Sequence, residues 1–168
     1  MALTMSGVGV ASFLTTLGAL SKILDKAAAH CAEKKIDQAV LLQTRLYPNM
    51  FPLVKQVQLV CDFAKNTLGR LTGEPPKFPD DEKTFDELKA RIAKTVDYVK
   101  GFSAADIDGT AGKDVTFPIG PQQTMTLNGA DYLVGFALPN FYFHATTAYD
   151  ILRHAGVELG KRDFLGRS

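Results

Sequence analysis

The sequence predicts an all-α protein built as a four-helix bundle. Four stretches, at about residues 6–33, 49–71, 84–102 and 128–156, carry apolar residues at spacings of three and four. This spacing places the apolar side chains along one stripe of each helix, as packing in a bundle requires. Of the 168 residues, 46% are hydrophobic and 22% charged, which is ordinary for a globular domain with a sizeable core. We therefore expect a single domain over residues 1–168.

The first helix has the most regular pattern. Its apolar residues are spaced 3, 4, 3, 4, 3, 4, namely Val10, Phe13, Leu17, Leu20, Leu24, Ala27 and Cys31. The first lysine is Lys22, so the apolar N-terminus lacks the basic region of a targeting segment, and we expect no membrane segment. Cys31 and Cys61 make no disulfide framework, which favours buried thiols in a reduced, cytoplasmic protein.

The other helices show start and stop signals. Pro52 falls in the first turn of the second helix, where proline is tolerated, and Gly73 follows its last turn. Thr84 and Glu87 form a capping box before the third helix, whose Lys89, Arg91 and Lys94 are expected on solvated faces. Asn128 is a good N-cap for the last helix, and Pro139 is expected to kink it.

The links between the helices complete the predicted fold. The link at residues 33–50 is apolar enough to pack against the bundle. Residues 115–117 and 124–127 have β-type composition on either side of a Pro-Ile-Gly-Pro turn, which predicts a short β-hairpin between the third and fourth helices. The long links after the first and third helices permit a crossover connection in place of a simple up-and-down bundle.

Polar residues on the predicted core stripe of the last helix are the candidates for a functional site. Asn140 and His144 follow Leu133 and Ala137 at the same rhythm, and Gln56 or Gln58 of the second helix would lie opposite. Buried polar groups must be hydrogen-bonded or line a cavity. Three interpretations follow, in order of preference: a structural network, a ligand pocket and a metal site.

Arg45, in the link before the second helix, is a further pocket candidate. It would either enter this polar site or, as the preferred interpretation, pair with a carboxylate or cap backbone carbonyls.

Several function classes lack support in the sequence. The formal net charge is +1 with no long basic run, so nothing favours nucleic acid or an anionic membrane surface as a partner. The chain contains no glycine-rich phosphate loop, no G-x-S-x-G and no H-E-x-x-H motif.

The segment LPNFYFHATTAYDILRHAGV, residues 138–157, and RLYPNM, residues 45–50, resemble an uncharacterised bacterial family within the DinB/YfiT-like superfamily of four-helix bundles. That superfamily carries three metal-binding histidines, one on the second helix and two, spaced H-x-x-x-H, on the last. His144 matches the second of that pair, whereas Asn140 takes the place of the first and the second-helix position falls near Gln56.

The resemblance implies a DinB-like bundle with a degenerate metal site and, as in many superfamily members, a homodimer. We expect no cofactor, a non-catalytic role and a small ligand bound in the bundle interior near Gln56, Asn140 and His144. One alternative is a metal-dependent transferase or hydrolase that uses His144 with Zn, Ni or Mn. The other is a structural or stress-related interaction protein, which would have no cavity around His144.

Overall fold

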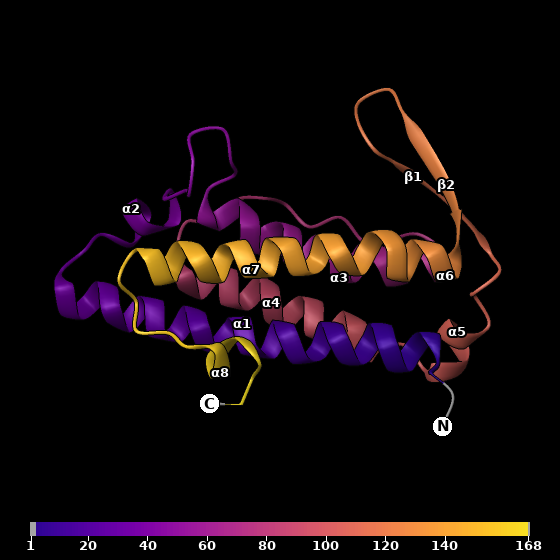
Figure 1. Ribbon diagram of the computed structural model, residues 1–168, viewed down its shortest axis with the longest axis horizontal. Helices are drawn as coiled ribbons and strands as arrows, with labels where there is room; N and C mark the ends of the chain where they lie inside the picture. The colour runs from indigo at the N-terminus through magenta and orange to yellow at the C-terminus, as the bar shows by residue number, and fades with distance from the viewer. Residues whose placement is uncertain (1–2, 168) are drawn as a thin grey trace.

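The computed structural model describes residues 3–167, so the first two residues and the last residue of the predicted domain lie outside the description. Four long helices form the predicted bundle: α1 (Met5–Lys34), α3 (Leu53–Thr72), α4 (Phe85–Lys100) and α7 (Leu138–His154). Helix α1 packs against α4 and α7, and α3 packs against the same two helices on the other side. Figure 1 shows that α1 and α7 run in one direction and α3 and α4 in the other.

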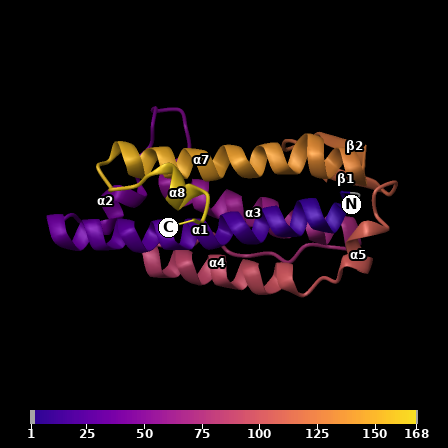
Figure 2. The ribbon, with the colours of Figure 1, turned by 60° about the horizontal axis from the view of Figure 1, so that its bottom comes forward.

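The crossover connection is present, but it is not in either of the two predicted links. Because α3 and α4 are parallel, residues 73–84 must return along the length of the bundle between them (Figures 1 and 2). This segment contains Pro75, Pro76 and Pro79, which favour an extended backbone. The links after the first and third helices instead contain short elements of their own.

The remaining elements lie at the ends and sides of the bundle. Short helices α2 (Gln38–Leu42) and α5 (Ala104–Asp108) follow α1 and α4, and α8 (Lys161–Phe164) packs on α1. The predicted hairpin is confirmed as β1 (Asp114–Pro118) paired antiparallel with β2 (Thr124–Asn128), with Phe117 opposite Met125. Val115 and Phe117 point into the core, which anchors the base of the hairpin.

The predicted caps and the core stripe of α1 are confirmed. Thr84 Oγ1 accepts from the Glu87 amide, and the Glu87 carboxylate accepts from the Thr84 amide, so the capping box of α4 is complete. Asn128 Oδ1 accepts from the Asp131 amide at the start of α6 (Gly129–Asp131). Along α1, six of the seven residues of the stripe are buried and Val10 is half-buried.

The last helix departs from prediction because it contains a π-helical stretch, η1 (Tyr132–Ala137), between α6 and α7. The Leu138 amide donates to the Leu133 carbonyl, five residues back, so this turn holds one residue more than an α-helical turn. The buried positions after it are Leu138, Phe141, Ala145, Thr147, Ala148, Ile151 and Leu152. Leu133 and Ala137 of the predicted stripe are buried, whereas Asn140 and His144 are half-buried at the edge of the interface.

Helix α1 is long and apolar enough, by length and composition, to cross a membrane. Here its apolar stripe packs in the core of the bundle. Both cysteines are free and buried, and burial raises the pKa of the Cys61 thiol to about 12. Neither thiol is placed for reaction with solvent.

Candidate functional site

His144 lies where α7 meets α3, and it contacts one polar and two aromatic side chains. Its Nδ1 is 2.7 Å from Gln56 Oε1. One face of its ring stacks on Phe63, with centroids 5.6 Å apart and planes 20° from parallel. The Phe143 ring meets it edge-on, with centroids 5.2 Å apart. The sequence offered Gln56 or Gln58 as the residue opposite His144, and the structure has Gln56 there. The sequence did not place Phe63 beside them.

The hydrogen bonds around Gln56 decide the tautomer of His144. Gln56 Nε2 donates to the Phe51 carbonyl oxygen at 3.0 Å, which leaves Gln56 Oε1 as an acceptor only. The proton in the bond to His144 must then be on Nδ1, so Nε2 of the neutral ring carries a lone pair. Because Gln56 is buried, with 1% of its surface exposed, this arrangement is held firmly.

His144 is neutral over the physiological range. Burial lowers the pKa of its imidazole to about 4, and the nearby charge of Lys55 acts in the same direction. Among residues 3–167, Nε2 has no hydrogen-bond partner. It is also not one of the side-chain nitrogen and oxygen atoms that are fully buried without a partner. The site thus presents one bare nitrogen acceptor at the protein surface.

Two of the sequence candidates do not join this pair. Asn140 Nδ2 donates to the Phe136 carbonyl at 2.8 Å, one turn back on its own helix. Arg45 is exposed, and its Nη1 donates to the carbonyls of Pro48 and Met50 at 3.3 and 3.0 Å. Arg45 therefore caps backbone carbonyls in its own loop and does not enter the site.

The donor set at His144 does not fit the metal centre of the superfamily. The described part of the chain contains no group of three or more His, Cys, Asp and Glu residues placed to hold a metal ion. Gln56 Oε1 already accepts from Nδ1–H, and the amide nitrogen of Asn140 is bound to the backbone. One imidazole and two neutral amides are a poor set for Zn, Ni or Mn, which prefer imidazole, thiolate and carboxylate ligands.

A second polar cluster, centred on Arg91, was missed at the sequence level. Arg91 was expected on a solvated face, but only 4% of its surface is exposed. Its guanidinium lies 2.9 Å from Asp62, 3.0 Å from Asp80 and 2.9 Å from Glu82, and Nη1 also donates to the Pro79 carbonyl at 2.7 Å. The acidic run Asp80-Asp81-Glu82 was the signal in the sequence that could have revealed it.

The Arg91 cluster fastens the crossover segment to the bundle. Phe78, from that segment, lies under three cations, with Lys94 Nζ 4.1 Å from its ring centroid. Gln58, the other glutamine considered for the site, donates from Nε2 to Glu82 Oε2 at 2.8 Å and so belongs to this cluster. The charges here neutralise one another and serve to hold residues 78–82 in place.

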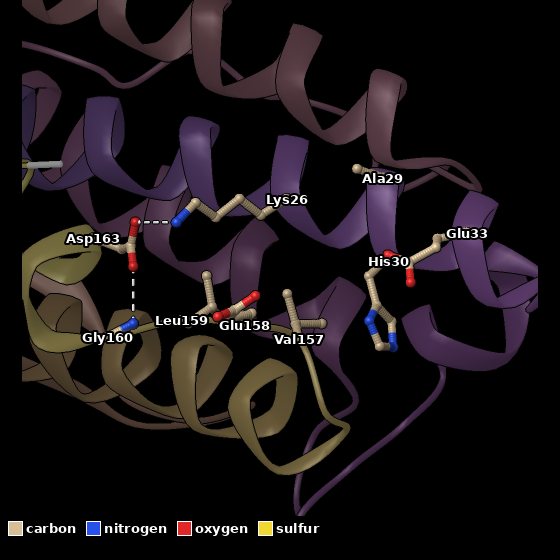
Figure 3. A pocket seen from close by; sticks show the side chains of 9 residues that line it. All are labelled: Lys26, Ala29, His30, Glu33, Val157, Glu158, Leu159, Gly160 and Asp163. Atoms are coloured by element: carbon tan, nitrogen blue, oxygen red, sulfur yellow. Dashed lines mark hydrogen bonds and ion pairs between the residues drawn. The ribbon is translucent and has the colours of Figure 1, made fainter.

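The largest hollows described lie away from His144. A pocket of about 550 Å³ opens between the end of α1 and residues 157–163 (Figure 3). Two of its ionic groups are paired with each other, since Lys26 Nζ lies 2.7 Å from Asp163 Oδ1, and the Gly160 amide donates to Asp163 Oδ2. His30, near the end of α1, is half-buried on the wall of this pocket.

Comparison with known proteins agrees with the fold. Residues 5–165 match the family described as a domain of unknown function, DUF1993. The chain is also similar to a DinB family member protein from Shewanella denitrificans, known from a crystal structure: it is 45% identical, the match covers 94% of this chain and 89% of that chain, and the TM-score is 0.86. The search of curated proteins gives no match. The chain therefore belongs to the DUF1993 family, and its fold is that of a DinB-like helical bundle.

Proposed function

We propose that this protein is a non-catalytic, metal-independent bundle that binds a small neutral molecule at His144. The observation that carries the proposal is the pair Gln56–His144, because it leaves a bare Nε2 acceptor open to solvent. A polar atom without a protein partner binds best a molecule that supplies the missing hydrogen bond. The position matches that of a metal ligand in the wider superfamily, so the degenerate metal site would have become a binding site of different chemistry.

Two further features support this proposal over its alternatives. The side chains recorded in contact with His144 are Gln56, Phe63 and Phe143, none of which is a nucleophile or an acid. A metal-dependent transferase or hydrolase would need more ligands than His144 supplies.

The test is metal analysis of the purified protein together with direct observation of the histidine tautomer. We expect much less than one equivalent of Zn, Ni or Mn, and no change in metal content in His144→Ala. Long-range ¹H–¹⁵N NMR spectra should show a protonated Nδ1 and an unprotonated Nε2 for His144. The double variant Gln56→His, Asn140→His restores the donor set of the superfamily and should gain Zn or Ni binding, which makes it the positive control.

Stoichiometric metal that is lost in His144→Ala would overturn the proposal in favour of the metal-dependent enzyme. A spectrum with the proton on Nε2 would overturn it as well, since the acceptor would then be absent. Cytoplasmic localisation and a homodimer remain predictions from the sequence, and the exposed ring of Phe143 is where we would look for a dimer contact.

A further inference from the structure

The β-hairpin projects from the bundle, and β2 is the strand with less support (Figure 1). β1 packs against α3 and buries Val115 and Phe117, whereas β2 packs mainly against β1. Four of the five residues of β2 are exposed, and Leu127 is half-buried. The side chain of Met125 leaves 37% of its residue surface in water. Because a two-stranded ribbon is only marginally stable by itself, a further strand beside β2 would stabilise the hairpin.

The register of the hairpin decides which backbone groups of β2 face outwards. The Ile119 amide donates to the Gln123 carbonyl at 3.0 Å, so these two residues form a hydrogen-bonded pair. In an antiparallel ladder, hydrogen-bonded pairs alternate with pairs that are not hydrogen-bonded. Thr126, opposite Thr116, and Thr124 therefore belong to the second kind of pair. Their amides and carbonyls point away from β1, along the free edge of the hairpin.

The two edges of the hairpin differ in their protection against pairing. On β1, Pro118 has no amide hydrogen to donate, and Asp114 carries a charge. β2, with the sequence Thr-Met-Thr-Leu-Asn, has neither a charge nor a proline. Within residues 3–167, no hydrogen bond engages the outward amides of Thr124 and Thr126. Proteins usually block a free edge with charges, proline or a bulge, so the open edge of β2 is typical of a strand that pairs with another chain.

We propose that β2 is an interaction surface for a second copy of this chain, whose own β2 pairs with it antiparallel to form a four-stranded sheet. The edge is complementary to itself. With Met125 of both copies at the twofold axis, Thr124 of each strand faces Thr126 of the other. Identical uncharged strands do not repel each other, and the exposed Met125 side chains cover one another. The inference is independent of the function proposed for His144.

The same geometry limits the assembly to two copies. In the four-stranded sheet the outer strands are the two β1 strands, and Pro118 leaves each outer edge without a donor at that position. The pairing is thus isologous and closed. The face of the sheet that carries the threonines can extend the contact already present in the hairpin, where Thr116 Oγ1 and Thr126 Oγ1 lie 2.8 Å apart.

The first test is a pair of matched proline variants. Thr126→Pro removes an outward amide on the open edge, whereas Thr116→Pro removes the outward amide directly opposite it on β1. Both lose the same hydroxyl contact, so they differ in the edge that they change. Sedimentation velocity over micromolar concentrations should show a wild-type dimer. Two intermolecular hydrogen bonds are lost in Thr126→Pro, so its Kd should rise about 30-fold, and Thr116→Pro should leave the Kd unchanged.

The second test is cross-linking, and it does not depend on a destabilising variant. Opposite residues of a pair without hydrogen bonds have Cα atoms about 4.5 Å apart, within the range that a disulfide spans. Met125→Cys should therefore form a disulfide-linked dimer under mild oxidation. Ile119→Cys is the control, because this residue is 42% exposed but lies beyond β1 and away from the axis. The native Cys31 and Cys61 are buried and should not react.

Three results would overturn the proposal. The first is a wild-type protein that stays monomeric at all concentrations. The second is a dimer that survives in Thr126→Pro, above all if it is lost in Phe143→Ser, which would move the contact to the exposed ring on α7. The third is cross-linking of Met125→Cys no faster than that of Ile119→Cys. Circular dichroism of each variant shows that the bundle remains folded.

Discussion

Replacing Arg91 with methionine tests whether the crossover segment is held by a buried charge cluster. Methionine fills part of the space of the arginine stem but removes all contacts of the guanidinium. The carboxylates of Asp62, Asp80 and Glu82 would then lose their shared partner. Removing one partner of a buried ion pair costs about 3–5 kcal/mol, because the charge left behind remains desolvated.

The contacts of the three carboxylates place Arg91→Met near the lower end of this range. Asp62 keeps Lys65 at 3.2 Å, and Asp80 keeps Lys55. Glu82, whose side chain is only 9% exposed, keeps just the Gln58 amide besides Arg91 among the contacts recorded. One carboxylate is thus left without a cation, and we expect a loss of about 3 kcal/mol in the free energy of unfolding.

The assay is urea denaturation followed by far-ultraviolet circular dichroism, since the chain has no tryptophan. In a thermal melt the same loss corresponds to a drop of about 6–12 °C in Tm. Lys89→Met is the control on the same helix: Lys89 pairs with Asp25, whose side chain is 57% exposed, so its loss should change stability far less than the loss of Arg91.

A second variant checks the cause. Adding Glu82→Gln to Arg91→Met removes the uncompensated charge and should recover part of the loss. The reasoning is refuted if Arg91→Met costs no more than Lys89→Met, or if the added Glu82→Gln lowers stability further.

Two other predictions concern single residues. The pKa of His144 is about 4 in the folded protein, below its ordinary value of 6.5, so the unfolded chain binds more protons between these values. Wild-type stability should therefore fall relative to a His144→Asn variant as the pH drops from 6.5 to 4, and parallel pH profiles of their urea midpoints would contradict this. A Cβ at Gly129 would lie 2.0 Å from the Thr110 carbonyl oxygen, so Gly129→Ala should cost about 1–3 kcal/mol or more in the free energy of unfolding. Gly18→Ala, with nothing within 4 Å in an exposed helical position, should instead stabilise by about 0.5–1 kcal/mol, and a similar loss for both in thermal melts would show the close approach to be unimportant.

Local signals in the sequence determined the helices and the hairpin. The capping box at Thr84, the N-cap at Asn128 and the apolar spacing of α1 all act over a few residues, and each appears in the structure as predicted. Gln56 and His144 could be considered together because both are polar residues in otherwise apolar helices. The structure shows them in contact, with His144 Nδ1 2.7 Å from Gln56 Oε1.

Only the tertiary structure decided the orientation and chemistry of the site. Asn140 and His144, predicted on the core stripe, lie half-buried at the edge of the core in the helix that follows the π-helical turn. The tautomer of His144 depends on the Phe51 carbonyl, which only the path of the 44–53 loop brings to Gln56. Arg91 was placed wrongly because charged residues are normally solvated, and its burial depends on carboxylates from two other segments. Local patterns do not encode such contacts, because each is stable only when distant parts of the chain have already packed together.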